Sequence, residues 1–264
     1  MNKKIRIAYI VLTCEKNIET LTVYQRNTFF KNVISDDIFF LSAYTKGNCY
    51  YSFNSPDEYE YCPIKYIRFF KNTELDFDYY IFIDDDTFVN VEELNCFLSS
   101  ISELFEGPLY IGNTDPLIIS HHNGLLSVNK KQKIKSIKGL LPDNGFGEKF
   151  CFSGGGGFVL DNKSYQIIKD KFMSLNEEEL YKLSFCNKSN SFYSDVLISE
   201  LLFNSKKKSQ ITSIVCPYFN FNNFTHRNKL LRVFYEFMKK KFITCHYVKT
   251  IVDFQYLDSL ANKS

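Results

Sequence analysis

The sequence predicts an α/β sandwich in which a mostly parallel central sheet lies between layers of helices. Short runs of β-branched and aromatic residues recur along the chain and end at polar turns, as buried strands do. Segments with the apolar spacing of helices separate several of these runs. The 264 residues contain neither an internal repeat nor a linker, so we expect one domain over residues 1–264.

The first part of the chain opens with an apolar run that ends at a polar turn, and mixed periodicity over residues 18–33 then indicates a helix. Asn90 with Glu93 three residues later forms a capping-box pattern, which predicts a helix from there to about residue 101. Strands are predicted at residues 5–12, 38–43, 66–70 and 79–83.

In the second part, residues 194–203 have the apolar spacing of a helix, and residues 227–240 form a basic amphipathic pattern that predicts another. The Lys-, Asn- and Gly-containing stretch that precedes residue 150 is expected to be a loop. Strands are predicted at residues 109–112, 150–160, 213–219 and 242–248.

The composition excludes several classes of protein. A hydrophobic content of 45% with 17% aromatics supplies the apolar area that a disordered chain lacks. A net charge of +2 gives no general attraction for nucleic acid, so no nucleic-acid partner is expected. The eight cysteines form no CxxC pair, which favours mostly buried thiols over a zinc site.

Targeting features are also weak in this sequence. No stretch approaches the roughly 20 apolar residues of a membrane span. The first apolar run is followed by Thr13, Glu15 and Lys16, which suits a strand better than a signal peptide. We therefore expect a soluble, cytoplasmic protein. Lys206–Lys208 and residues 227–241 suggest peripheral contact with an anionic membrane, with solvated lysines as the alternative.

Three consecutive aspartates, Asp84, Asp85 and Asp86, follow the predicted strand at residues 79–83. In open α/β sheets, ligands bind beyond the carboxyl ends of the strands, and adjacent carboxylates repel one another unless a divalent cation joins them. Alternation along an extended segment directs Asp84 and Asp86 to one side and Asp85 to the other. The alternative is a solvated acidic turn that caps the next helix.

Four consecutive glycines at positions 154–157 allow positive φ angles and a close approach of the backbone, so a substrate could lie against bare main chain. The alternative is a flexible β-bulge. The run is not a dinucleotide fingerprint, because Val159 stands where the third glycine is required.

The segment Ile83-Asp84-Asp85-Asp86-Thr87-Phe88-Val89 resembles the metal-binding signature of the Fringe-like and related β1,3-glycosyltransferases. Further segments resemble the family's nucleotide-binding opening, middle strand, glycine motif, catalytic-base segment and C-terminal metal histidine, in the family's order. These segments are Thr13-Cys14-Glu15-Lys16 with Arg26–Phe29, Leu109–Gly112, Phe152–Phe158, Tyr193–Val196 and Thr244–Tyr247. The resemblance spans residues 5–248.

The resemblance implies a GT-A-type, Rossmann-like fold, with a nucleotide-sugar-binding half at about residues 1–112 and an acceptor-binding half at about residues 113–264. It also implies inverting, metal-dependent transfer of a sugar from a UDP-sugar to a glycan or lipid-linked saccharide, with a β1,3 linkage expected. Galactose, N-acetylglucosamine and glucose all stay open as the donor sugar.

The same resemblance implies roles for individual residues. Asp86 would coordinate Mn²⁺, or Mg²⁺, with His246 as the second protein ligand, and Asp84 would contact the ribose or the donor sugar. An imidazole joined to carboxylates suits Mn²⁺ better than Ca²⁺. The stretch between Asp195 and His246 is longer than in Fringe itself, so His226 and Asn222 stay as rival ligands. The implied donor-binding residues are Thr13, Lys16, Arg26, Asp84, Asp85, Gly155 and Gly156.

Asp195 is the expected catalytic base, since an inverting transfer needs a carboxylate to accept the proton of the attacking hydroxyl. The alternative is an acidic residue stabilised by the helix dipole. A metal-dependent phosphatase or nucleotidyltransferase is a rival enzyme class, although a haloacid-dehalogenase frame fails because Phe88 stands where Thr or Val is required. A non-catalytic glycan-binding relative is a second rival.

Overall fold

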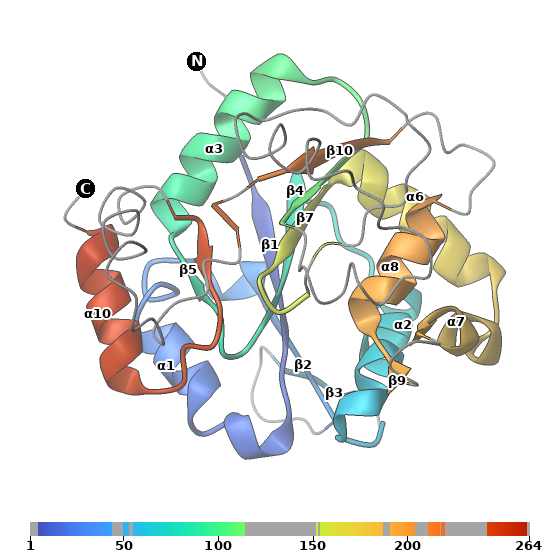
Figure 1. The fold of residues 1–264 in the computed structure, drawn as a ribbon, viewed down its shortest axis with the longest axis horizontal. Helices are drawn as coiled ribbons and strands as arrows, with labels where there is room; N and C mark the ends of the chain where they lie inside the picture. Colours follow the sequence, from blue (N-terminus) through green and yellow to red (C-terminus); the bar gives the residue numbers. More distant parts are fainter. Residues whose placement is uncertain are drawn as a thin grey trace, which may run out of the picture.

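The computed structural model describes residues 5–43, 50–52, 55–113, 152, 154–186, 191–203, 211–216, 218–219 and 242–262. Its centre is a seven-stranded sheet with the strand order β10-β6-β7-β4-β1-β2-β3 (Figure 1). All neighbouring strands are parallel except β7, which runs antiparallel to both β4 and β6. The strands are β1 Ile7–Leu12, β2 Ile38–Ser42, β3 Tyr50–Ser52, β4 Tyr79–Asp84, β6 Leu109–Gly112, β7 Phe158–Asp161 and β10 Thr212–Val215.

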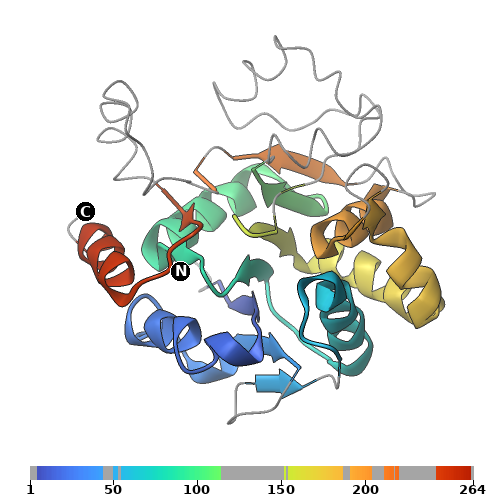
Figure 2. The same cartoon turned by 60° about the horizontal axis from the view of Figure 1, so that its bottom comes forward.

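Helices cover both faces of this sheet, so the predicted α/β sandwich is confirmed. Helices α1, α3 and α10 lie on one side, and α2, α6, α7 and α8 lie on the other (Figures 1 and 2). The helices are α1 Leu21–Asn27, α2 Cys62–Asn72, α3 Val91–Leu104, α6 Asn162–Ser174, α7 Glu177–Leu183, α8 Ser194–Phe203 and α10 Ile251–Ala261. Short 3₁₀ segments are η1 Glu15–Asn17, η2 Ser35–Asp37 and η3 Tyr59–Tyr61.

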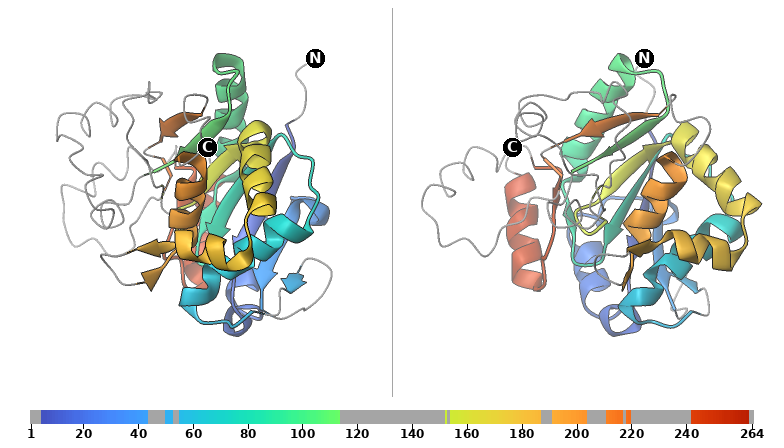
Figure 3. Two further views of the ribbon diagram at one scale, coloured as in Figure 1. Left: turned by 90° about the vertical axis from the view of Figure 1, so that its right-hand side faces the viewer. Right: turned by 45° about the vertical axis from the view of Figure 1, so that its right-hand side comes forward.

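Strand β1 shows why the sequence contains continuous apolar runs rather than alternating ones. All six of its residues are buried, because both faces of the sheet are covered. Tyr9 and Val11 belong to the apolar cluster beneath α1, α3 and α10, whereas Ala8 and Ile10 belong to the cluster beneath α2, α6 and α8. The sheet therefore separates two apolar cores, and Figure 3 shows helices on both of its sides.

Two small sheets complete the described structure. Strand β5, Phe88–Val89, pairs antiparallel with β11, Thr244–Cys245, and β8, Phe185–Cys186, pairs with β9, Ser191–Phe192. The β5–β11 pair brings the C-terminal part of the chain beside the aspartates that follow β4. This pairing determines where His246 lies.

One predicted strand is wrong, because residues 66–70 lie within α2. The helix has Pro63 in its first turn and buries Tyr66, Phe69 and Phe70 on one side. Four apolar residues interrupted by Arg68 form a short pattern that fits either type of element. The helix predicted after Asn90 is confirmed, and the Asn90 side chain accepts a hydrogen bond from the backbone N–H of Glu93. A full capping box would also need the Glu93 side chain to accept from the backbone N–H of Asn90, but this N–H donates to the carbonyl of Ile243 instead.

Other predicted elements are shorter than expected, and some lie outside the described residues. Among the described residues, the strands expected at 150–160, 213–219 and 242–248 correspond to the shorter β7, β10 and β11 respectively, and β10 begins one residue earlier than expected. Residues 206–208 and 227–241, on which the expected membrane contact rested, are not among the described residues. Cys216 and Cys245 are buried as expected, whereas Cys14 and Cys62 are half-buried and Cys96 is exposed.

Candidate active site

The candidate site lies at the edge of the sheet where β1 and β4 end side by side. Leu12 pairs with Asp84 in the parallel register, so the segments after both strands leave the sheet together. The backbone N–H of Asp85 donates to the Leu12 carbonyl at 3.0 Å, and that of Thr87 donates to the Asp84 carbonyl at 3.1 Å. The three aspartates therefore sit on a tight, well-bonded turn.

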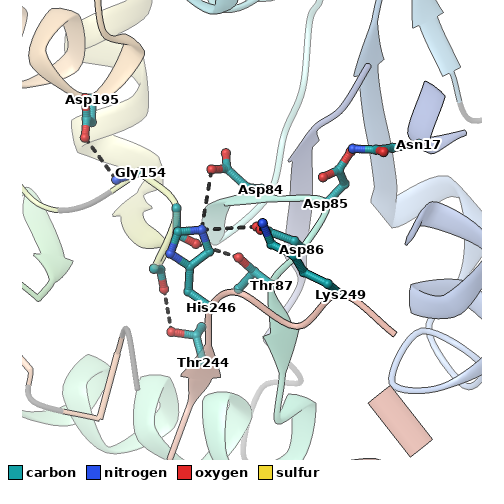
Figure 4. Close-up of polar contacts among 12 residues, drawn as sticks. Asn17, Asp84, Asp85, Asp86, Thr87, Gly154, Asp195, Thr244, His246 and Lys249 are labelled. Carbon is teal, nitrogen blue, oxygen red and sulfur yellow. Dashed lines mark hydrogen bonds and ion pairs between the residues drawn. The ribbon is translucent and has the colours of Figure 1, made fainter. Parts of the chain in front are cut away.

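Asp84, Asp86 and His246 form a cluster whose ligand atoms all lie within 4.8 Å of one another (Figure 4). His246 Nε2 lies 3.1 Å from Asp86 Oδ1 and 4.0 Å from Asp84 Oδ2. The position of His246 follows from the β5–β11 pair and from the bond that the Val248 N–H donates to the Asp86 carbonyl at 2.8 Å. The chain thus brings together groups separated by about 160 sequence positions (246 − 86).

The electrostatics of this cluster favour a cation. The pKa of Asp84 is raised to about 7, chiefly by burial; His246 opposes this rise, and the neighbouring carboxylates of Asp86 and Asp85 contribute to it. A divalent ion would remove this penalty by joining the carboxylates. Two carboxylates and an imidazole form a donor set that fits Mn²⁺, so the residues present suit the expected metal.

Asp85 faces the opposite way from its neighbours, as alternation along the segment predicts. Its Oδ2 accepts hydrogen bonds from Thr13 Oγ1 at 2.6 Å and from Asn17 Nδ2 at 2.9 Å (Figure 4). Burial raises the pKa of Asp85 more than these two hydrogen bonds lower it, and the resulting pKa is about 6. Asp85 therefore connects the turn after β4 to the loop after β1, and its expected contact with the donor stays a prediction.

A buried lysine on α2 holds the loop after β1 in place through hydrogen bonds. Lys65 of α2 is 1% exposed, and its Nζ donates to the Thr13 carbonyl at 2.8 Å and to Asp57 Oδ1 at 2.7 Å. Asp57 Oδ2 accepts from the Glu15 N–H at 2.6 Å. This support was not predicted from the sequence, although Lys65 lies four residues before Phe69 on the buried face of a helix.

Helix α1 contributes a second support that was not predicted from the sequence. Gln25 is buried, and its Nε2 donates to the Asp84 carbonyl at 3.2 Å and the Thr87 carbonyl at 3.0 Å. Its neighbour Arg26 has its guanidinium 4.9 Å from the centre of the Phe40 ring in β2. The Arg26 guanidinium therefore lies against β2, and Lys16 is exposed on η1. Their donor-binding roles stay predictions.

Residues 154–157 form a tight turn, here called the glycine turn, rather than a bulge. The Gly157 N–H donates to the Gly154 carbonyl at 3.1 Å, and Gly157 has a φ of 89°, which favours glycine. Thr87 Oγ1 donates to the Gly155 carbonyl at 2.5 Å, and Thr244 Oγ1 donates to the carbonyl of Gly156. Two threonines from the β5–β11 region thus fix the turn.

Gly155 is required for the position of the imidazole. A Cβ added to Gly155 would lie 2.2 Å from His246 Cε1 and 2.5 Å from Nε2, far inside van der Waals contact. The bare backbone that the sequence predicts here therefore accommodates His246. Contact of Gly155 and Gly156 with a donor stays a prediction.

Asp195 lies on the other side of the glycine turn, in the first turn of α8. It is 5% exposed, and its Oδ2 accepts a hydrogen bond from the Gly154 N–H at 3.1 Å (Figure 4). A small cavity of about 30 Å³ is lined by Asp84, Gly154, Gly155 and Asp195. Tyr59 and Cys62, which no sequence pattern singled out, line it too.

The structure therefore brings Asp84, Asp86, His246 and Asp195 around one glycine turn. The rival ligands His226 and Asn222 lie outside the described residues. Within the part of the chain that is described, no helix is both long and apolar enough to cross a bilayer.

Comparisons with known proteins extend these observations. The family model described as Fringe-like matches residues 4–216 of this chain. The chain is similar in structure to WbbM, a bifunctional glycosyltransferase solved in its apo form, with 12% identity and a TM-score of 0.51. That match covers 97% of this chain and 50% of WbbM, so this chain spans about half of its length.

Two further solved structures match with lower TM-scores. The galactosyltransferase LgtC, in complex with donor and acceptor sugar analogs, is 15% identical with a TM-score of 0.44, over 97% of this chain and 95% of LgtC. A glycosyltransferase involved in glycosylation of the major capsid of PBCV-1 is 12% identical with a TM-score of 0.47, over 95% and 99% of the two chains. No curated protein matches this chain.

Proposed function

This chain belongs to the Fringe-like family of glycosyltransferases and has the GT-A fold, and from that premise we propose that it transfers a sugar from a UDP-sugar to a saccharide acceptor with inversion. The observation that carries the proposal is the convergence of Asp84, Asp86 and His246 on one side of the glycine turn with Asp195 on the other. Sugar transfer needs a cation-binding cluster and a base that are separated by no more than the length of one sugar.

Asp86 and His246 would hold Mn²⁺, with Asp84 positioned to contact the ion or the donor sugar. When bound, the ion would neutralise charge on the departing diphosphate. Lys249, whose Nζ lies 4.0 Å from Asp86 Oδ2, adds a positive charge at the same side. The proposed division places donor binding mainly in residues 1–112 and acceptor binding mainly in residues 113–264, with His246 crossing over to the donor side.

Asp195 would act as the base on the opposite side of the reacting carbon. The acceptor hydroxyl gives its proton to the Asp195 carboxylate as its oxygen forms the new bond to the anomeric carbon. The bond between that carbon and the UDP oxygen breaks, and the electron pair stays on the diphosphate. The Gly154 N–H holds the Asp195 carboxylate in place, and the burial of Asp195 keeps competing water away from this carboxylate.

The proposal is tested by UDP binding and by turnover with UDP-galactose, UDP-N-acetylglucosamine and UDP-glucose. We expect Asp86→Ala to remove Mn²⁺-dependent UDP binding, and Asp195→Asn to abolish transfer while UDP still binds. UDP binding that is indifferent to EDTA and to Asp86→Ala would overturn the metal assignment. Full activity of Asp195→Asn would overturn the base, and phosphate release from monoesters without sugar transfer would indicate a phosphatase instead.

A further inference from the structure

Three aromatic residues line the small cavity that Asp195 also lines. These residues, here called the aromatic wall, are Tyr59, Phe192 and Tyr193. Tyr59 comes from η3, far from the other two in sequence, and its ring meets that of Tyr193 edge-on, with centroids 6.2 Å apart. The wall thus joins the two halves of the chain across the site.

Contacts with α7 hold the aromatic wall in place. Phe192 stacks on Tyr181 of α7, with centroids 4.1 Å apart and an interplanar angle of 13°. The Tyr181 hydroxyl donates to the Glu60 carbonyl at 3.2 Å, which connects α7 to η3. The wall is therefore held in place before any ligand arrives, and this lowers the entropic cost of binding.

Tyr59 stands out because the residue is 67% exposed although it lines the same cavity as the carboxylates of Asp84 and Asp195. Core packing does not account for a large aromatic ring in this position. A tyrosine hydroxyl is protonated at neutral pH, so that of Tyr59 is available as a hydrogen-bond donor beside Asp84 and Asp195.

The chemistry of this surface matches a pyranose ring. Such a ring presents a face of C–H groups with hydroxyls at its edge, and an aromatic face with a polar tip complements both parts. Phe192 and Tyr193 lead directly into the helix that carries Asp195, whereas Asp86 and His246 lie on the other side of the glycine turn. A sugar on this wall would therefore present a hydroxyl to Asp195.

We propose that Tyr59 and Tyr193 form the acceptor subsite, in which the sugar that receives the transferred residue stacks on the aromatic wall and bonds to the Tyr59 hydroxyl. This inference rests on the proposed function, and it assigns a residue of the N-terminal half to the acceptor. The wall fixes which face of the acceptor sugar turns toward the solvent, and so which hydroxyl can reach Asp195.

The test separates the acceptor subsite from the donor site. Calorimetry with Mg²⁺ and UDP first measures the donor site, and failure of the wild-type protein to bind UDP would sink the proposed function itself. Saturation-transfer NMR on the diamagnetic Mg²⁺–UDP complex then measures binding of the methyl β-glycosides of galactose, N-acetylglucosamine and glucose. Each measurement is repeated on Tyr59→Phe, Tyr59→Ala and a control, Tyr256→Ala, which removes a 45%-exposed tyrosine from α10.

We expect at least one glycoside to bind the wild-type complex and to bind Tyr59→Ala roughly three- to tenfold more weakly, the range expected for one lost aromatic contact. Tyr59→Phe should retain most of this binding, because the ring remains, and Tyr256→Ala should match the wild type. UDP affinity should be the same in all four proteins. Glycoside binding that is unchanged in Tyr59→Ala, or absent from a wild-type protein that binds UDP, would overturn the inference. Equal losses of UDP and glycoside binding in a folded Tyr59→Ala protein would also overturn it.

Discussion

Replacement of Gly155 by alanine should damage the proposed metal site without replacing any of its proposed ligands. The added Cβ would lie 2.2 Å from His246 Cε1 and 2.5 Å from Nε2. Because carbon atoms in ordinary contact are about 3.5–4.0 Å apart, the imidazole must move by roughly 1.5 Å. Metal–ligand distances tolerate only about 0.2 Å, so His246 would no longer bind an ion held by Asp86.

The expected loss of Mn²⁺ affinity can be estimated from what is usual when a metal site loses a ligand or a ligand's hydrogen-bond partner. Loss of an outer-shell partner alone lowers metal affinity about 10- to 100-fold, and loss of a direct ligand should reach at least the upper end of that range. We therefore expect Mn²⁺ affinity to fall about 100-fold, or roughly 2.7 kcal/mol. Titration of the protein with Mn²⁺, followed by the electron paramagnetic resonance of the free ion, measures this directly.

Two comparisons isolate the steric cause. Gly154→Ala is the matched control, since its Cβ would lie 3.4 Å from Asp195 Cβ, and it should keep its Mn²⁺ affinity. In a double-mutant cycle, Gly155→Ala should cost almost nothing once His246→Ala is already present, because no imidazole remains to be displaced. Wild-type Mn²⁺ affinity in Gly155→Ala would refute the reasoning, and so would additive losses in the double mutant.

Three further changes test the supports around the site. Thr87→Val removes the hydroxyl that donates to the Gly155 carbonyl, so Mn²⁺ affinity should fall about fivefold whereas Thr87→Ser should restore it; equal affinities in Val and Ser variants would contradict this. Lys65→Met leaves Asp57 without its buried cation and should lower the free energy of unfolding by about 1–3 kcal/mol in urea denaturation, whereas a more stable variant would contradict it. Asp161→Ala removes the acceptor for the N–H groups of Leu109 and Ser164, and the same measurement should show a loss of about 2–3 kcal/mol; a loss below about 0.5 kcal/mol would show that water replaces the carboxylate.

The sequence was most informative where one physical requirement dominates. Residues 7–12 and 79–83 form continuous apolar runs because these strands are buried on both faces of a sheet, and few other short elements require such a pattern. The strand that ends at Asp84 also determines that the aspartates lie at the edge where ligands bind. The alternation that separates Asp85 from its neighbours follows from extended backbone geometry alone.

The sequence was less informative where tertiary contacts decide. Residues 66–70 have an apolar pattern that fits either a strand or a helix, and the packing of α2 against the sheet decided between them. Lys65, Gln25 and Tyr59 act through partners that are distant in sequence, and no local pattern encodes such pairings. Glycine-rich sequence alone did not show that Gly155 makes room for an imidazole.

The β5–β11 pair makes completion of the site depend on the last part of the chain. Every strand of the seven-stranded sheet lies before residue 216, whereas His246 directly follows β11, which begins at Thr244. The same part of the chain buries Phe242, Phe254 and Leu257 in the core beneath α3. Truncation before residue 242 would therefore remove the imidazole and core packing at once, so the cation-binding cluster and the stability of the fold would be lost together.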